Sequence, residues 1–339
     1  MERQNKDQQE TKLIAEMHET PAIIRDFPVD EASAFLPRSE RVLLSGEGSS
    51  RLFPAKYTRY RTLLHAGGPD IDVDGALQAA EYDVRKHHVY VSSNSGRTAE
   101  AVQLLESCRQ RQNGPVHTTA VVAHDDTPVA RMADEVYVLT CGPESAVAAT
   151  KSVVEQALFF DTVFRSATER TPPETRLISE AFEEALLQEI PGDIVRRAVQ
   201  AGVIYFAGRN DGVAEELALK TNEITRVQSS YLEGTYAVHG IEEVMSPSDL
   251  VVLVHPFPDQ EAKFREVLCD GVGLAVIAIA SRKTSFPTIQ VPDIGEYNQY
   301  VQLAAGWNLL VSTGLSLGID IDTPVRARKV GNEIVSGSR

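Results

Sequence analysis

The chain has 339 residues, of which 33 are basic and 48 acidic, giving a formal net charge of −15. This charge argues against a nucleic-acid or anionic-membrane surface, because both would repel the chain as a whole, so an anionic ligand has to be held by a local site. The sequence has no membrane-length apolar run, and its first thirty residues are polar without a signal-peptide core, so we expect a cytoplasmic protein.

Short apolar segments alternate with helix-length segments from Arg41 onward, which is typical of a parallel sheet covered by helices. In the first half, the predicted strands are Arg41–Ser45, Ile71–Val73, His88–Ser92, Thr118–Ala123 and Glu135–Thr140. A long helix is predicted near Ser145–Ala167. The polar segment after it contains the Pro172–Pro173 pair, which does not fit inside a helix, so we place a domain boundary there.

The second half repeats this plan. Its predicted strands are Val203–Ala207, Arg226–Ser230, Asp249–His255, Leu274–Ala280 and Thr288–Val291, and a long helix follows over Tyr297–Leu317. The first strand of each half ends in a short loop, Gly46-Glu47-Gly48 and Gly208-Arg209-Asn210, which is a faint internal repeat. We therefore predict an α/β protein with two flavodoxin-like subdomains, each a parallel five-stranded sheet flanked by helices, with ligands at the carboxyl ends of the strands.

The predicted boundaries give an N-terminal helical arm (1–35), a first domain (36–172), a second domain (173–325) and a C-terminal tail (326–339). The arm is too short for a DNA-binding domain and a linker. Cys108, Cys141 and Cys269 lie far apart without CxxC or histidine spacing. They indicate buried thiols, with no disulfide framework and no metal site.

The strongest local signal is an apolar strand that runs into Ser93-Asn94-Ser95-Gly96-Arg97-Thr98 and then into a helix. Hydroxyls, a permissive glycine and the free N–H groups of a helix start form an anion cradle that needs no lysine. An N-capped strand-to-helix turn favours the same residue types, so chemistry alone leaves both interpretations open.

Two other loops belong to the same predicted crevice. Gly46-Glu47-Gly48-Ser49-Ser50 follows the first strand, and Glu144–Lys151 opens the helix that closes the first half. In the second of these loops, Ala149 and Thr150 would add backbone or hydroxyl contacts. An ordinary helix start is the alternative there.

These three segments, in this order, resemble the sugar isomerase (SIS) domain, and the whole chain resembles the tandem-SIS isomerase portion of the glutamine–fructose-6-phosphate aminotransferase family and its stand-alone relatives. The family's Ser-Gln-Ser-Gly-Glu-Thr phosphate loop corresponds to Ser93–Thr98, its Gly-Thr-Ser loop to Gly48-Ser49-Ser50, and its Ala-Ser-Thr-Lys helix start to Ala148–Lys151. The resemblance implies substrate or phosphate binding by Gly48, Ser49, Ser50, Ser93, Asn94, Ser95, Thr98 and Ala149. Ala149 stands where relatives carry a hydroxyl that contacts the sugar, a departure that bears on the substrate rather than on the fold.

In the second half, Ala218–Ile224 resembles the family's Leu-Lys-Leu-Lys-Glu-Ile helix. The resemblance implies that Glu223 is the base that moves a proton between C1 and C2, with Lys220 on the same helix face. The residues alone are more typical of a surface ion pair on a solvated helix. Sixteen positions later, His239-Gly240 matches the family's His-Gly segment, which implies a histidine supplied across a dimer interface to help open the sugar ring. By itself, His239 also fits a structural role.

Near the C-terminus, Thr323–Val330 resembles the family's closing Pro-Arg-Asn-Leu-Ala-Lys-Ser-Val tail, whose lysine lies at the active site. Lys329 matches that lysine, and a solvated basic residue is the alternative. Around His239 the loop is remodelled, because Ile241 replaces the family's proline and Thr235 replaces an acidic residue.

The resemblance implies an enzyme that acts on a small-molecule sugar phosphate as a homodimer with a shared site, without a metal or nucleotide cofactor. We rank glucosamine-6-phosphate deaminase first, and a fructosamine-type 6-phosphate deglycase or a plain phosphosugar isomerase as alternatives. The family's glutamine-dependent synthase needs an N-terminal glutaminase domain with a nucleophilic cysteine, so we expect no glutamine hydrolysis from this sequence. A non-catalytic sugar-phosphate sensor is the other class; two SIS halves, the acidic charge and a candidate base argue against it.

Overall fold

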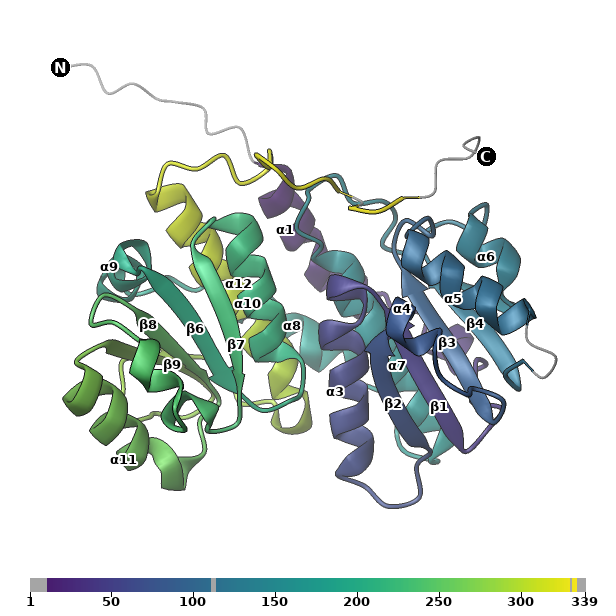
Figure 1. Cartoon of the computed structure of the whole chain (residues 1–339), viewed down its shortest axis with the longest axis horizontal. Helices are drawn as coiled ribbons and strands as arrows, with labels where there is room; N and C mark the ends of the chain where they lie inside the picture. The colour runs from purple at the N-terminus through teal and green to yellow at the C-terminus, as the bar shows by residue number, and fades with distance from the viewer. Residues whose placement is uncertain (1–10, 111–113, 330, 334–339) are drawn as a thin grey trace.

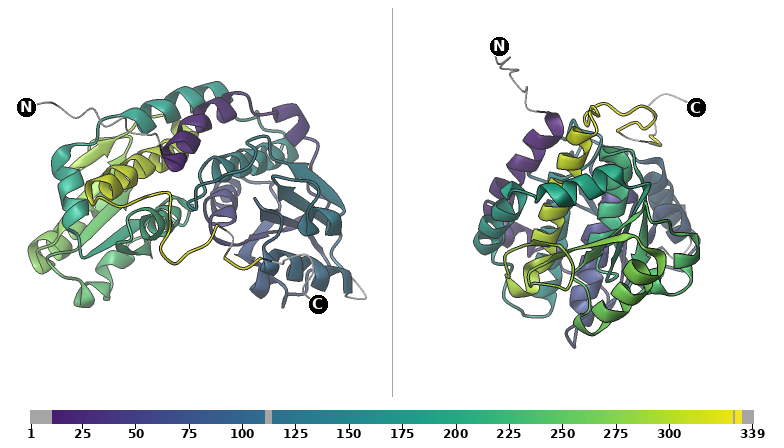
Figure 2. Two further views of the ribbon diagram at one scale, coloured as in Figure 1. Left: turned by 90° about the horizontal axis from the view of Figure 1, so that it is seen from above. Right: turned by 90° about the vertical axis from the view of Figure 1, so that its left-hand side faces the viewer.

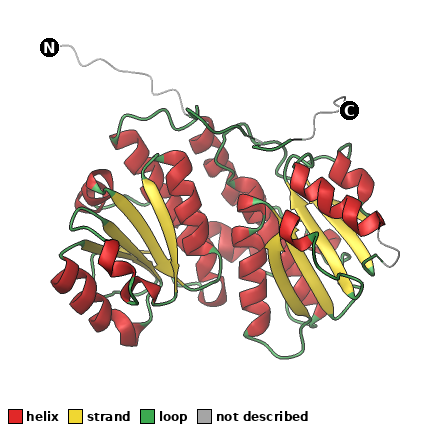
Figure 3. Ribbon diagram, in the orientation of Figure 1, coloured by secondary structure: helices red, strands yellow, loops and turns green. Residues whose placement is uncertain are grey.

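The computed structural model describes residues 11–110, 114–329 and 331–333. It contains two five-stranded parallel sheets with helices on their faces (Figure 3). The strands of the first sheet are β1 (Arg41–Gly46), β2 (Asp70–Gly75), β3 (His87–Ser93), β4 (His117–Val122) and β5 (Glu135–Val138). Those of the second are β6 (Val203–Gly208), β7 (Gln228–Glu233), β8 (Leu250–Val254), β9 (Ala275–Ala280) and β10 (Thr288–Gln290). The orders β2-β1-β3-β4-β5 and β10-β9-β8-β6-β7 are the same flavodoxin-like arrangement, so the predicted fold class is confirmed.

The helices cover both sheets and join them. The first group comprises α1 (Lys12–Arg25), α2 (Val29–Ala32), α3 (Leu52–Leu63), α4 (Ala76–Ala79), α5 (Ala99–Gln110), α6 (Pro128–Met132) and α7 (Lys151–Ala167). The second comprises α8 (Thr175–Leu187), α9 (Gly192–Gln200), α10 (Val213–Ile224), α11 (Glu261–Phe264), which continues as a π-helical segment (Arg265–Val272), and α12 (Asn298–Ser316). Figures 1 and 2 show two lobes, with the last described segment crossing from the second lobe to the first. Residues 1–10 of the predicted arm, and residues 330 and 334–339 of the predicted tail, lie outside the described residues.

The central strands are buried on both faces, as a parallel sheet between helices requires. Every residue of β3 and of β8 is buried. All ten predicted strands are present, with their ends displaced by a few residues. The largest displacement is at β7, which starts at Gln228 because Arg226 has a φ of 59°, in the left-handed region that an extended strand excludes.

One helix boundary was predicted wrongly. The helix expected from Ser145 begins only at Lys151, as α7. The side chain of Glu16 accepts hydrogen bonds from the backbone N–H groups of Ser145 and Ala146, and Glu144 accepts one from Thr150 at 2.7 Å. The carboxylate of Glu16, from outside the segment, and that of Glu144, from within it, bind these backbone donors, so residues 143–150 form a loop.

Tight packing fixes α10, the helix that carries the predicted base. A Cβ atom at Gly306 of α12 would lie 2.3 Å from a methyl carbon of Leu217, so the absence of a side chain lets α10 approach α12 closely. On the same helix, buried Trp307 packs edge-on against Phe182 of α8, with ring centroids 5.8 Å apart. α10 also packs against α3 of the first lobe, where Lys56 pairs with Glu215. The lobes therefore meet along α10.

A buried carboxyl group, that of Asp211, lies two residues before α10. It accepts a hydrogen bond from the backbone N–H of Val213 at 3.2 Å, and the Gln299 amide lies 3.5 Å away. Burial raises the pKa of Asp211 to about 6, against the opposing effect of these donors. The protonated acid is therefore favoured by folding, and the stability that it contributes at low pH is lost as the pH rises from about 4 through 6.

We expect Asp211→Asn to remove this pH dependence. The parent chain loses stability between pH 4 and pH 7 as Asp211 ionises, and the variant does not. The difference in free energy of unfolding between the variant and the parent chain should therefore change by about 2 kcal/mol in favour of the variant over this range, because a shift of one pKa unit corresponds to about 1.4 kcal/mol. Urea unfolding at several pH values measures this difference. The exposed Asp259, changed to Asn, serves as the control. Parallel stability curves for the parent chain and Asp211→Asn would contradict the prediction.

Candidate functional site

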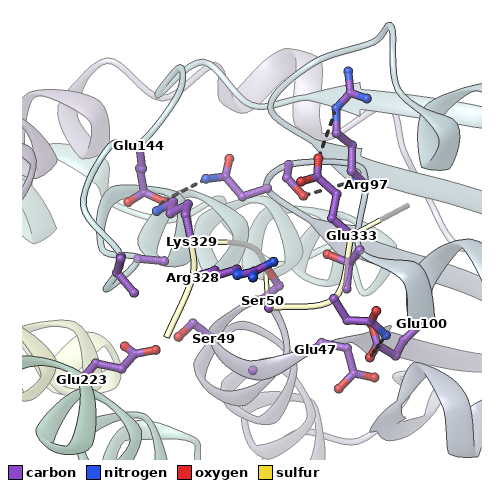
Figure 4. Close-up of a pocket in the computed structure, with 18 of the residues that line it drawn as sticks. Glu47, Ser49, Ser50, Arg97, Glu100, Glu144, Glu223, Arg328, Lys329 and Glu333 are labelled. Atoms are coloured by element: carbon purple, nitrogen blue, oxygen red, sulfur yellow. Dashed lines mark hydrogen bonds and ion pairs between the residues drawn. The ribbon is translucent and has the colours of Figure 1, made fainter. Parts of the chain in front are cut away.

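A cavity of about 700 Å³ lies between the lobes, bounded by loops at the carboxyl ends of the first sheet, by α10 and by the C-terminal segment (Figure 4). Ten of the predicted site residues line it: Gly48, Ser49, Ser50, Asn94, Ser95, Thr98, Ala149, Lys220, Glu223 and Lys329. They come from five separate parts of the sequence. The fold thus brings most of the predicted site together.

The turn between β3 and α5 is built as a cradle of hydroxyl and N–H groups. The Ser93 hydroxyl lies 2.9 Å from that of Thr98 and accepts a hydrogen bond from the Gly96 N–H at 3.1 Å. Gly96 has a φ of +61°, and a Cβ atom there would lie 2.2 Å from the Thr127 hydroxyl, so the turn requires glycine. Ser93 is only 2% exposed and lies beneath the turn, whereas Asn94, Ser95 and Thr98 face the cavity.

The loop after β1 brings a second pair of hydroxyl groups to the cavity. It forms a 3-10 turn at Gly48–Ser50, and Gly48 has a φ of +52°. At Gly46, a Cβ atom would lie 2.6 Å from the carbonyl oxygen of Ser92, so glycine allows β1 and β3 to end side by side. The two loops therefore open onto one space.

The face of α10 toward this space carries a buried lysine between two carboxylates. The ammonium group of Lys220 lies 3.1 Å from Glu216 and 2.9 Å from Glu223. It also donates to the Ser49 hydroxyl at 2.6 Å, which joins the lobes. Lys220 and Glu216 are fully buried, while the Glu223 side chain is 24% exposed toward the cavity. The alternative of a solvated surface ion pair is therefore wrong.

Charge compensation keeps this lysine protonated. Burial by itself lowers the pKa of Lys220, but the carboxylates of Glu216 and Glu223 outweigh it, so the pKa is raised. Burial raises the pKa of Glu216, and Lys220 opposes that shift. Lys220 is thus a fixed cation that orients Glu223 and Ser49, rather than a group that exchanges protons at neutral pH.

The third predicted segment, residues 143–150, is shaped by Glu144. Its carboxylate accepts hydrogen bonds from the Asn94 amide at 2.9 Å and from the Ser152 hydroxyl. Lys329 donates to the carbonyl oxygen of Ala146 and lies 4.0 Å from Glu144. Burial lowers the pKa of Lys329, although Glu144 and Glu16 oppose this shift. This lysine therefore lies at the cavity, as expected, and is not a freely solvated tail residue.

The C-terminal segment closes one side of the cavity. The Ala99 N–H, at the start of α5, donates to the carbonyl oxygen of Asn332 at 2.9 Å, and Thr98 and Glu333 form an isolated antiparallel bridge. The guanidinium group of Arg97 lies 3.8 Å from the Glu333 carboxylate. These contacts hold the tail against the turn between β3 and α5, which is the predicted phosphate-binding loop.

Two predicted site residues do not line the cavity: Ser93, which is buried beneath the turn between β3 and α5, and His239. His239 is exposed and ends a 3-10 turn (Tyr236–Val238) after β7. Several polar residues of the site were not predicted: Glu16, Glu47, Arg97, Glu144, Glu216, Arg328 and Glu333. Glu216 could have been found from its position one helical turn before Lys220, and Glu144 lies in a segment already singled out. The tail residues reach the cavity through contacts more than two hundred positions apart in sequence.

Within residues 11–110, 114–329 and 331–333, no group of three or more histidine, cysteine, aspartate or glutamate side chains has an arrangement that could hold a metal ion. None of the helices in this same part of the chain has the length and apolar character needed to span a membrane.

In comparison with known proteins, residues 36–166 match the sequence model of the SIS domain. The second half of the chain repeats the sheet topology of the first.

Among relatives, the chain is similar to glutamine–fructose-6-phosphate aminotransferase (isomerizing) of Bradyrhizobium diazoefficiens, with 26% identity over 280 residues, 75% of this chain and 46% of that protein. It spans about half the length of the curated relatives that it matches. Its fold is that of the C-terminal domain of glucosamine-fructose-6-phosphate aminotransferase from Francisella tularensis (TM-score 0.76, 19% identity, 94% of this chain and 99% of that chain). It is also that of glucosamine-6-phosphate deaminase from Thermotoga maritima (TM-score 0.74, 17% identity, 94% and 98%).

Proposed function

We propose that this protein is a sugar-phosphate isomerase or deaminase of the SIS type, and that its substrate is an aminosugar phosphate. The observation that carries the proposal is the position of Glu223. Its Oε2 is held by the buried Lys220, and the side chain faces a cavity whose opposite wall contains Asn94, Ser95 and Thr98. A carboxylate is thus fixed at one side of a small-molecule cavity, with an anion cradle at the other.

This arrangement suits proton transfer between neighbouring carbons. The phosphate binds at Asn94, Ser95, Thr98 and the start of α5, where hydroxyls and N–H groups favour an anion. Binding at that remote end positions C1 and C2 of the sugar against Glu223. Glu223 then removes a proton from one carbon and returns it to the other, as a general base and acid.

For the substrate, we rank glucosamine 6-phosphate first. Its conversion with water gives fructose 6-phosphate and ammonium. The similar folds of a glucosamine-6-phosphate deaminase and of an aminotransferase domain support this choice. So does the presence of Lys329 beside Glu144 at the cavity, since these groups supply hydrogen-bonding partners for an amine. A fructosamine-type 6-phosphate deglycase and a phosphosugar isomerase that releases no amine are the alternatives.

A small panel of sugar phosphates tests the proposal. We expect ammonium release from glucosamine 6-phosphate, together with fructose 6-phosphate as the product. Amine release only from fructosamine 6-phosphates would assign the deglycase, and aldose–ketose conversion without amine release would assign the isomerase. Tight binding of sugar phosphates with no turnover of any member would reject the enzyme and favour a sensor.

We also propose a homodimer in which His239 of one subunit serves the cavity of the other. The exposed position of His239, outside its own cavity, motivates this proposal. Mixing the inactive Glu223→Gln and His239→Ala chains should restore part of the activity, because one of the two shared sites is then intact. No recovery in verified mixed dimers contradicts the shared site.

A further inference from the structure

Four cationic side chains line the cavity, and three of them have partners. Lys220 pairs with Glu216 and Glu223, Lys329 donates to Ala146, and Arg97 lies beside Glu333. The fourth, Arg328, forms no hydrogen bond or ion pair with any residue that the structure describes. Figure 4 shows its side chain extending across the cavity toward Ser50.

Among the described residues, none of the carboxylates that line the cavity is paired with Arg328, and each makes other contacts. Glu47 accepts from the Ala76 N–H, Glu100 from the Asn332 amide, Glu144 from the Thr150 N–H, and Glu223 and Glu333 face Lys220 and Arg97. A guanidinium group binds oxyanions through paired N–H donors. Arg328 therefore presents an unused oxyanion-binding group to the ligand space.

The chain on both sides of Arg328 is held in place. Before it, Arg226 donates to the carbonyl oxygens of Asp320 and Thr323 at 2.8 and 2.7 Å. After it, Lys329 binds Ala146, and Asn332 accepts from the Ala99 N–H. The tail thus delivers the guanidinium group to the cavity at a defined place beside the hydroxyl cradle.

We propose that Arg328 is a substrate-binding residue whose guanidinium group binds an oxyanion of the substrate. This inference rests on the proposed function, since it takes the ligand to be a sugar phosphate. Two groups of a sugar-phosphate substrate are oxyanions that a guanidinium group binds. One is the phosphate itself, and the other is a carboxylate on the amine substituent of a fructosamine 6-phosphate. The second group would assign the deglycase among the candidate activities.

The test compares Arg328→Met with Arg326→Met. Arg326 is an exposed arginine of the same segment that does not line the cavity, so its variant has the same change in net charge. Calorimetry measures binding of glucosamine 6-phosphate, of fructosyl-glycine 6-phosphate and of inorganic phosphate, and needs no turnover. We expect Arg328→Met to weaken binding by about tenfold or more, as loss of a charge-assisted hydrogen bond predicts, and Arg326→Met to change it less than about twofold.

The pattern across ligands identifies the oxyanion. Equal weakening for all three ligands assigns Arg328 to the phosphate, and weakening confined to fructosyl-glycine 6-phosphate assigns it to the carboxylate. Equal effects of the two variants, or none from Arg328→Met, would overturn the proposal. If Arg328→Met weakens binding but the parent chain turns over no sugar phosphate, the binding assignment holds and the proposed enzyme activity fails.

Discussion

We expect Glu223→Gln to lower kcat for amine release by a factor of about 10²–10⁴, the usual contribution of a positioned general base. Sugar-phosphate binding should change little. Glutamine has nearly the same shape, and its amide oxygen still accepts the hydrogen bond from Lys220, but it takes up no proton at neutral pH. Steady-state kinetics and calorimetry on one preparation separate the two effects.

Exchange of the substrate's carbon-bound hydrogen with deuterium from solvent tests the same step directly, and Glu223→Gln should abolish it. Glu215→Gln is the matched control, because Glu215 lies on the same helix, pairs with Lys56 and does not line the cavity. A Glu223→Gln chain that retains the parent's kcat and exchange rate would remove Glu223 from the mechanism.

The second large effect concerns stability. Lys220→Met leaves the carboxylate of Glu216, which is fully buried, without a cation. Breaking a buried ion pair on one side typically costs about 3–5 kcal/mol, so we expect the free energy of unfolding at pH 7 to fall by about this amount. Urea denaturation measures it.

A companion variant separates the loss of charge compensation from the loss of packing. In Lys220→Met/Glu216→Gln no fully buried charge remains unpaired, and only Glu223, which is partly exposed to the cavity, loses its cation, so most of the lost stability should return. The penalty of Lys220→Met should also shrink at lower pH, because protonation of Glu216 removes the uncompensated charge. A double variant as unstable as the single one would assign the loss to packing instead.

The fold class was predictable because strands that are buried on both faces need continuous apolar runs, which are visible in the sequence. The apolar runs of β3 and β8 are buried on both faces, and such runs separated by helix-length segments leave few alternatives to a parallel sheet. Boundaries set by single side chains were not predictable. The late start of α7 depends on Glu16, more than a hundred positions away, because its carboxylate binds the backbone of the preceding loop.

The site was predictable where a short motif carries its own geometry. The Ser93–Thr98 turn combines hydroxyls, a glycine with positive φ and a helix start within six residues, so its sequence indicates its shape. Lys220 and Glu223 were predicted from helical spacing and resemblance, but the full burial of Lys220 follows from contact with Ser49 of the other lobe. The place of Arg328 follows from the path of the tail, which no local pattern in the sequence specifies.

Asp322, four residues before the tail (326–339) begins, accepts hydrogen bonds from the backbone N–H groups of Lys12 and Leu13 at the first turn of α1. This contact makes the tail a short tether. Arg328 lies six positions after Asp322, so its Cα atom stays within about 20 Å of the Asp322 Cα atom even when the chain is extended. A tether of this length gives an effective concentration of millimolar order. Weak individual contacts therefore suffice to keep Arg328 at the cavity.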